Sequence, residues 1–419
     1  MTGHVHVIGA GLAGLACALD LAEAGARVTL HEGSPKPGGR CRSYHDAVLD
    51  RRIDNGNHLM LSGNAAVLSH AVRIGAADRL VMLPDAAFPF VDLANGARWT
   101  VRVPATPREA LRPDSRPPGA TPGAALSGVG ALLMAGPGRT VAEAVRDRGP
   151  MWRTFWEPMT TAVLNMPPEV GSAALLRAAL LRSFFRGARA CRPVLAPEGL
   201  GEALIDPAVA RLRQMGVEIR FRAPLAGLAL DGDRAEALAF TDGTRVALGP
   251  RDRLVLAVPP VALNDLLPGL PRPFPGPSIL NAHFLVSPEL ASAAPPLLGL
   301  LSSNAQWLFR RGDVLSVTVS AAEATPVGAL GREEALDLLW SEVARALDLR
   351  DVPPLARRLL RERAATFDQS PEGAALRPAT VTPWRNLVLA GDHVNTGLPA
   401  TLEGAVISGR RAAARALAA

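Results

Sequence analysis

The stretch 1–34 constrains the fold more than any other part of the chain. An apolar run of strand length, Val5–Ile8, leads into a glycine-rich turn, and the residues after the turn are apolar at helical spacing. A second apolar run follows Gly25 and closes on Glu32. Strand, glycine turn, helix, strand and acid, in this order, are typical of a nucleotide-binding βαβ unit.

Each glycine of the turn has its own role in such a unit. Gly9 permits the tight turn, Gly11 lets the backbone approach a pyrophosphate at the positive end of the helix dipole, and Gly14 lets the helix pack closely on the sheet. Glu32 follows at roughly the 20-residue spacing at which a carboxylate accepts hydrogen bonds from a ribose. The stretch therefore predicts a bound dinucleotide, and a chance glycine-rich turn is the alternative.

A second glycine pair follows the acid and bears on the choice between NAD and FAD. The segment Gly33–Ser43 contains Gly38, Gly39 and Arg40, and paired glycines let a chain pass close to a cofactor without a side-chain clash. The segment resembles the GGR motif of glutathione-reductase-type FAD enzymes, in the branch of the amine oxidases and carotenoid desaturases. A solvated proline-glycine loop is the alternative.

The far end of the chain agrees with FAD. Residues 387–392 read as a buried strand that ends in a turn at Gly391 and Asp392, and residues 401–409 read as the start of a helix. In the resembled families the turn meets the ribityl chain and phosphate, and the helix N-terminus faces the flavin pyrimidine carbonyl. Reduced flavin carries negative charge there, which the positive end of a helix favours. We therefore expect FAD rather than NAD alone.

Five longer motifs are GGRCRS at 38–43, DNGNHLML at 54–61, WEPMTTAVLN at 156–165, PEGL at 197–200 and LAGDHVNTGLPATLEGAVISGRRAA at 389–413. With these motifs the chain resembles the hydroxysqualene dehydroxylase family, formerly called squalene-associated FAD-dependent desaturases. Family members usually have glutamine at Asn57, tryptophan at His393 and aspartate at Asn395. The resemblance implies an α/β fold, with a glutathione-reductase-type, Rossmann-like FAD-binding domain beside an α+β substrate domain of amine-oxidase and desaturase type.

The order of the motifs divides the chain between these two domains. We expect residues 1–62, 191–262 and 364–419 in the FAD-binding domain, and residues 63–190 and 263–363 in the substrate domain. The resemblance implies that the FAD site consists of Gly9, Gly11, Leu12, Ala13, Gly14, Glu32, Gly33, Gly38, Gly39, Arg40, Asn55, Gly56, Asn57, His58, Leu225, Gly391, Asp392, Pro399, Thr401 and Leu402.

The resemblance also implies a reaction. Hydroxysqualene, a C30 allylic alcohol, would lose its hydroxyl group to give squalene, with a hydride from N5 of reduced FAD and an acid to assist the departing hydroxide. His58 and His393 are the candidate acids, because histidine changes charge near neutral pH. A histidine satisfied by backbone hydrogen bonds is the alternative for His58. The substrate cavity should be long and apolar.

Three other functions remain open. A carotenoid- or squalene-type desaturase would transfer the hydride in the opposite direction. An amine oxidase usually has an aromatic cage beside the flavin, and Tyr44 is the only tyrosine of this chain. A scaffold that holds FAD for isoprenoid enzymes is the third. Residues 391–404 contain no cysteine, so covalent attachment of the flavin is not expected.

Composition limits the partners and the compartment. No apolar run is long enough to span a bilayer and no signal peptide precedes Val5, so we expect a cytoplasmic protein. The net charge of +6 is almost all arginine, with Lys36 the only lysine, and no basic run is interleaved with aromatic residues, so nucleic acid is not expected. Cys17, Cys41 and Cys191 show no metal spacing, and no metal is expected.

An insoluble substrate makes a membrane surface and an upstream synthase of the squalene pathway the expected partners. Residues 173–192 predict one arginine-studded helix, which would either lie in a membrane interface or pack on its own domain. Its apolar face would consist of Leu176, Leu180, Leu181 and Phe184.

Four further stretches carry expectations for the substrate domain. Residues 104–123, rich in proline and glycine, predict a mobile loop, and residues 124–134 predict a short apolar helix. The aromatic stretch 151–165 would either line the cavity or belong to the core. Strand-like runs within 279–320 suit a sheet beneath the cavity.

Overall fold

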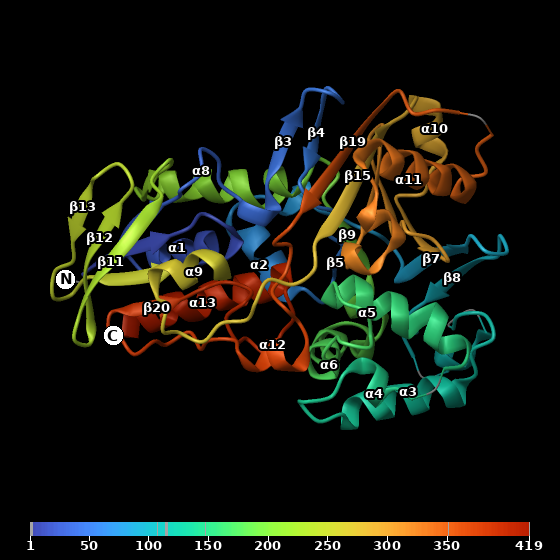
Figure 1. The fold of residues 1–419 in the computed structure, drawn as a ribbon, viewed down its shortest axis with the longest axis horizontal. Helices are drawn as coiled ribbons and strands as arrows, with labels where there is room; N and C mark the ends of the chain where they lie inside the picture. The colour runs from blue at the N-terminus through green and yellow to red at the C-terminus, as the bar shows by residue number, and fades with distance from the viewer. Residues whose placement is uncertain (1–2, 107, 114–115, 147, 351, 419) are drawn as a thin grey trace.

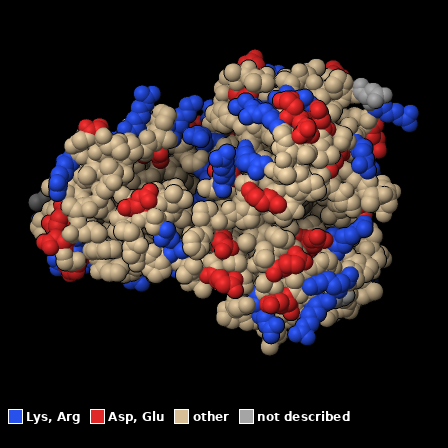
Figure 2. All heavy atoms as spheres, in the orientation of Figure 1, with Lys and Arg blue, Asp and Glu red and all other residues tan. Residues whose placement is uncertain are grey.

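The computed structural model describes residues 3–106, 108–113, 116–146, 148–350 and 352–418. The predicted domains and the predicted loop at 104–123 also include residues 1, 2, 107, 114, 115, 147, 351 and 419, which lie outside the described part. The chain forms two lobes, and both termini lie at the end of the same lobe (Figure 1). On the face drawn in Figure 2, arginines and acidic side chains are interspersed over both lobes.

The lobe with the termini is built on a parallel sheet whose strands come from distant parts of the sequence. Its order is β10 (Glu218–Arg220), β2 (Arg27–His31), β1 (His4–Ile8), β14 (Arg253–Leu256) and β20 (Leu387–Leu389). The three segments predicted for the FAD-binding domain supply these strands. This arrangement supports the predicted division of the chain, which remains a prediction.

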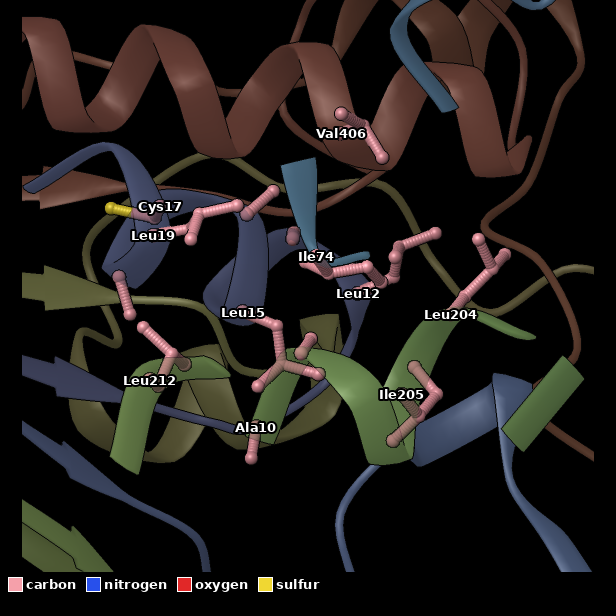
Figure 3. Packing of buried hydrophobic residues seen from close by; sticks show 14 of the residues in the cluster. Ala10, Leu12, Leu15, Cys17, Leu19, Ile74, Leu204, Ile205, Leu212 and Val406 are labelled. Atoms are coloured by element: carbon pink, nitrogen blue, oxygen red, sulfur yellow. The ribbon is translucent and has the colours of Figure 1, made fainter. Parts of the chain in front are cut away.

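Helices α1 (Leu12–Glu23), α8 (Asp206–Gln214) and α13 (Leu402–Ala418) pack around this sheet in layers. Val406 of α13, Leu12 and Leu15 belong to one hydrophobic cluster, and Leu15 points to the side of α1 away from Val406, toward the segment that leads into α8 (Figure 3). The contact between α1 and α13 is close because Gly409 has no side chain: a Cβ there would overlap the backbone of Ala13. The close packing fixes both ends of the predicted cofactor site relative to one another.

The second lobe contains a larger sheet, in which β16 and β7 are parallel and the other neighbours antiparallel. Its order is β19 (Ala356–Glu362), β15 (Ile279–Leu285), β18 (Val314–Val319), β17 (Trp307–Arg311), β16 (Leu297–Leu301), β7 (Ala87–Asp92) and β8 (Arg98–Arg102). Helix α11 (Arg332–Ala346) covers one face through Leu339 and Val343. The predicted sheet within 279–320 is present, and its other face lines a cavity described below.

A layer of short helices lies in the second lobe on the side away from α11 (Figure 1). It contains α3 (Pro122–Met134), α4 (Val141–Ala144), α5 (Glu157–Leu164), α6 (Ala173–Arg182) and α7 (Ala188–Cys191). The apolar helix predicted at 124–134 is confirmed as α3.

The single helix predicted over 173–192 is wrong. Helix α6 ends at Arg182, since Ser183 leaves the helical conformation (φ −125°, ψ −98°) and Gly187 adopts a positive φ of 74°. Leu176 and Leu180 are buried against neighbouring helices rather than presented to a membrane.

The remaining elements connect the two lobes or cover their edges. Small sheets are formed by β3 (Ser43–Asp46) with β4 (Arg51–Asp54), by β5 (Met60–Leu61), β9 (Pro193–Leu195) and β6 (Val81–Met82), and by β11 (Leu225–Asp231), β12 (Arg234–Phe240) and β13 (Arg245–Ala247). Short helices are α2 (Ala65–Arg73), α9 (Pro260–Leu266), α10 (Pro288–Ala293) and α12 (Pro371–Ala375). Within the described ranges, no helix combines the length and the apolar character that crossing a bilayer requires.

Candidate functional site

The turn between β1 and α1 has the geometry of a phosphate-binding loop. Gly9 has a φ of +106°, and a Cβ on Gly14 would overlap the carbonyl oxygen of Gly9, so both positions require glycine. Within the described part of the chain, the space beside Gly11 is open and no side chain caps the N-terminus of α1. An uncapped helix N-terminus with an open approach fits the pyrophosphate of a dinucleotide.

Glu32 lies at the end of β2 and is held by the loop itself. Its carboxylate accepts hydrogen bonds from the backbone N–H groups of Ala10 (2.7 Å) and Ser34 (2.8 Å). Its carbonyl accepts from the N–H of Ala223 at 2.9 Å, next to the start of β11 at Leu225. Glu32, Gly33 and the segment before Leu225 therefore meet at one end of the predicted site.

The second glycine pair lies directly on the first loop. The N–H of Gly38 donates to the carbonyl of Ala10 at 2.8 Å, and a Cβ on Gly39 would lie 3.7 Å from the Cα of Gly11. Gly38 and Gly39 both have positive φ values, of 105° and 52°. The two glycine motifs, separate in the sequence, thus form one backbone surface.

Arg40 connects this surface to the late segment of the chain. Its guanidinium donates two hydrogen bonds to the carboxylate of Asp392, at 2.9 and 2.5 Å, and one to the carbonyl of Ala365 at 2.9 Å. Burial opposes ionisation of Asp392, but the positive charge of Arg40 and the hydrogen bonds donated to the carboxylate together outweigh it and hold the pKa of Asp392 well below its usual range. Gly391, beside it, has a φ of +142°. The predicted turn therefore lies beside the second glycine loop.

Arg377 organises the same late segment and was missed from the sequence. Its buried guanidinium donates to the backbone carbonyls of Leu398 (2.7 Å), Asp392 (2.9 Å) and Val394 (2.7 Å). Burial lowers the pKa of Arg377 to about 10, so the side chain remains charged at neutral pH. No local motif marks this arginine, because its partners are backbone atoms that any residue supplies.

The DNGN segment reaches the cavity, while its aspartate anchors it. Asp54 is fully buried, accepts from the hydroxyl of Ser43 and the N–H of Leu200, and pairs with Arg311. His58 lines the cavity, and its Nδ1 lies 3.1 Å from the carbonyl oxygen of Gly56, which makes Nδ1 the donor. Burial, with smaller contributions from two arginines, lowers the pKa of His58 below its ordinary value.

His393 is in a different environment. It is 2% exposed, packs against Gly391 and does not line the cavity, and its Nδ1 lies 3.9 Å from the carboxylate of Asp392. The two candidate acids are therefore not brought to one place.

The segment that follows Gly391 and Asp392 does reach the cavity at its far end, and we call it the closing segment. Pro399, Thr401 and Leu402 line it, and the hydroxyl of Thr401 accepts from the N–H of Gly404 at 3.1 Å, which caps helix α13. Of the residues predicted for the FAD site, the cavity is lined by Arg40, Asn55, Gly56, Asn57, His58, Pro399, Thr401 and Leu402. The others lie along the glycine loops and the closing segment, beside or beyond it.

The cavity has a volume of about 310 Å³ and lies between the larger sheet and the helical layer. Away from the predicted flavin residues its walls are mainly apolar, with Phe88, Phe90, Val101, Phe155, Met159, Val163, Leu180, Phe184, Trp307 and Phe309. The aromatic stretch 151–165 divides between the two predicted roles: Phe155 lines the cavity, whereas Trp156 is 1% exposed in the core.

Polar residues on the sheet floor were not predicted. Asn281 and Thr318 line the cavity beside Asn57, and the hydroxyl of Thr318 donates to Asn281 Oδ1 at 3.0 Å. The sequence carries one signal for them: an asparagine interrupts the apolar strand Ile279–Leu285 at a buried position.

Comparison with known proteins finds relatives that agree with one another in family and in name. A model of the family of flavin-containing amine oxidoreductases matches residues 12–417. The chain is 42% identical to the hydroxysqualene dehydroxylase of Rhodopseudomonas palustris, over 100% of this chain and 99% of that protein. It is 37% identical to the hydroxysqualene dehydroxylase of Zymomonas mobilis, over 98% of each.

Solved structures agree on the fold. Cyclohexylamine oxidase from Brevibacterium oxydans matches 100% of this chain and 99% of its own with a TM-score of 0.73 and 16% identity. At this identity the similarity supports the fold alone, and it confirms the predicted fold class.

Proposed function

The chain belongs to the flavin-containing amine oxidoreductase family and, within it, to the hydroxysqualene dehydroxylases, and we propose that it removes the hydroxyl group of hydroxysqualene to give squalene. The observation that carries the proposal is the identity of 42% and 37%, over nearly the whole chain, to two proteins named for that activity. The family predicted from the sequence motifs is thereby confirmed. A cavity with apolar walls at the end of the flavin site suits a C30 hydrocarbon chain.

The family identifies the cofactor as a flavin, and we propose that it is FAD. The glycine loop at Gly9–Gly14 would hold the pyrophosphate, Glu32 the ribose, and the backbone before Leu225 the adenine. Arg40, Asp392 and the start of α13 would hold the flavin end. The predicted division into a FAD-binding domain and a substrate domain is part of this proposal.

The reaction breaks a C–O bond and forms a C–H bond. A reduced flavin bound here would supply the hydride. The departing oxygen must then take up a proton and leave as water. We assign this proton to His58: its Nδ1 hydrogen is engaged with Gly56, so Nε2 is the nitrogen that takes up and releases the second proton. The buried position of His393 away from the cavity makes it the weaker candidate.

A substitution at His58 tests this role. Because burial lowers the pKa of His58 below its ordinary value of 6.5, kcat should still be rising as the pH falls below 6.5. His58→Gln should lower kcat and flatten this pH profile, with flavin still bound. Wild-type turnover with an unchanged pH profile would remove His58 from the mechanism.

A membrane surface is the proposed source of substrate, and helix α3 is the element that we assign to it. Its 13 residues contain no charged side chain, only Gly128 and Leu132 are buried, and Leu126 and Met134 are 74% and 86% exposed. Leu111, shortly before α3, is 68% exposed, and the nearby Arg108, Arg112 and Arg139 are exposed as well. Apolar residues flanked by arginine suit the interface of an anionic bilayer.

The position of α3 places this surface next to the cavity wall. A Cβ on Gly128 would lie 2.8 Å from the indole of Trp156, and the ring centroids of Trp156 and Phe155 are 5.0 Å apart. Phe155 lines the cavity. The side chains of Trp156 and Phe155 therefore lie between the exposed apolar helix and the proposed substrate site.

Vesicle flotation tests the membrane proposal. The double variant Leu126→Asp, Met134→Asp should lose binding to vesicles of phosphatidylethanolamine and phosphatidylglycerol but keep activity on detergent-dispersed substrate. Val261→Asp, at a position 55% exposed on the other lobe, is the matched control and should float as the wild type does. Equal flotation of all three proteins would contradict a role for α3. We also propose that the protein works at the cytoplasmic side of the membrane, next to the synthase that supplies its substrate.

Product analysis tests the function. The purified holoenzyme should convert hydroxysqualene to squalene when its flavin is reduced, and should leave phytoene unchanged when its flavin is oxidised. Desaturated products from the oxidised enzyme would instead identify a desaturase. Oxidation of amines would identify an amine oxidase, and flavin binding without any turnover would identify a scaffold.

A further inference from the structure

The floor of the cavity changes from polar to aromatic along a single row of the larger sheet. Asn281 of β15 pairs in register with Thr318 of β18, and Thr318 pairs with Trp307 of β17. Gly299 of β16 and Phe90 of β7 continue the row. Residues in register on adjacent strands project to the same face. The amide and the hydroxyl at one end therefore face the same space as the aromatic rings at the other end, and all four of these side chains line the cavity.

The polar end of the row is a buried hydrogen-bonded cluster. Asn281 and Thr318 are 1% and 8% exposed. The Nδ2 of Asn57 donates to the hydroxyl of Thr318 at 3.1 Å, and that hydroxyl donates to Asn281 Oδ1 at 3.0 Å. Together these bonds fix the orientation of both amide groups.

Two atoms of the cluster have hydrogen-bonding capacity left over. The Oδ1 of Asn57 is buried and accepts no hydrogen bond within the described part of the chain. The Nδ2 of Asn281 carries two hydrogens and donates one, to the carbonyl of Asn55 at 3.4 Å. A buried acceptor without a partner is unfavourable, and a ligand that donates a hydrogen bond would remove that cost. One acceptor beside one donor matches the two hydrogen-bonding roles of an alcohol.

The arginines that line the described cavity do not offer an alternative anchor for an anionic ligand. The two arginines that line it are paired, Arg40 with Asp392 and Arg182 with Glu403, the latter at 3.6 Å. A ligand with a phosphate or carboxylate would have to displace one of these partners. A neutral ligand with a single hydroxyl group would not.

We propose that Asn57 and Asn281, positioned by Thr318, form the subsite that binds the hydroxyl group of an allylic alcohol. The alcohol donates to Asn57 Oδ1 and accepts from Asn281 Nδ2, while its hydrocarbon chain lies over Trp307 and Phe90. The inference rests on the proposed function, and it deepens it. The hydroxyl-bearing carbon is held beside the segment 55–58, at the flavin end of the cavity. The hydrocarbon product lacks the hydroxyl and leaves Asn57 Oδ1 unpaired, so the subsite favours substrate over product.

Ligand affinities of the oxidised holoenzyme test the subsite, because no hydride is available and neither ligand turns over. Dissociation constants for hydroxysqualene and squalene are read from the change in flavin absorbance. Asn281→Leu should weaken the affinity for the alcohol by about 3- to 10-fold, the usual effect of one hydrogen bond, and leave the affinity for squalene unchanged. Thr318→Val should do the same by releasing the two amides, and Thr318→Ser should restore the wild-type preference.

Trp307→Phe, in the same row, is the matched control and should weaken the binding of both ligands equally. The proposal would be overturned if Asn281→Leu and Thr318→Val lowered the affinity for both ligands equally, or lowered it for neither. The test is separate from that of the function. Preference for the alcohol without squalene formation by the reduced enzyme would retain the subsite and refute the dehydroxylase, and squalene formation without preference would do the reverse.

Discussion

The flavin end and the substrate end of this molecule are built in different ways. The flavin end is formed mainly by backbone atoms. Glycine is required at position 9 by the positive φ and at position 14 by close contact, and the loop at Gly38 packs against the first loop. At the substrate end, side chains such as Asn281 and Thr318 meet only because the sheet places them in register. The flavin end can therefore be recognised from a contiguous sequence motif. The residues of the substrate end are brought together only by the strand order of the sheet.

The prediction with the largest effect on stability compares a residue of the core with its neighbour in the cavity wall. Trp156→Ala should lower the free energy of unfolding by about 3–5 kcal/mol, because a fully buried indole is lost. Phe155→Ala, at the neighbouring position that lines the cavity, should cost less stability and weaken hydroxysqualene binding. Denaturant unfolding and ligand titration of both variants measure this. Equal loss of stability in both would show that the cavity wall is ordinary core.

The second effect isolates the backbone role of the glycine loop. Among the described residues outside the local backbone, no atom lies within 4 Å of a Cβ placed on Gly11, so Gly11→Ala should change the unfolding free energy of the flavin-free protein by less than about 1 kcal/mol. Its Cβ would instead occupy the space predicted for the pyrophosphate, and FAD affinity should fall by about 100-fold, or about 2.7 kcal/mol. Gly130→Ala, equally open in α3, should leave FAD affinity unchanged. Wild-type affinity in Gly11→Ala would place the pyrophosphate elsewhere.

The smallest effect concerns acid stability of the flavin lobe. His70 of α2 is fully buried, and burial lowers its pKa from 6.5 to about 4. Below pH 6.5 the unfolded chain binds a proton that the folded chain refuses, so stability falls as the pH falls towards 4. At pH 5 this single group should cost about 2 kcal/mol. His70→Leu should therefore unfold less readily than the wild type at pH 5, relative to pH 7.5. An identical difference between the two pH values in both proteins would contradict this.

The sequence predicted the strand, turn and helix around Gly9–Gly14 in detail and the apolar cavity in outline. The strand, glycine turn and Glu32 are adjacent in the chain, so their pattern is readable. Arg377 is not, because its partners are carbonyls of a loop 15–21 residues away, brought near by the fold. The single helix predicted at 173–192 is wrong because Ser183 and Gly187 interrupt it, and Leu176 and Leu180 of its predicted apolar face pack inward whereas Leu181 is exposed. The exposed apolar helix is α3. Its sequence is apolar all round, so the composition alone did not predict which of its faces is exposed to solvent.

We infer that the flavin site and the apolar cavity work as one unit. Anaerobic addition of hydroxysqualene to the photoreduced holoenzyme tests it most directly, with flavin absorbance and squalene followed in the same sample. We expect the flavin to reoxidise with one squalene formed per flavin. A flavin that stays reduced while hydroxysqualene binds and remains intact would contradict the claim.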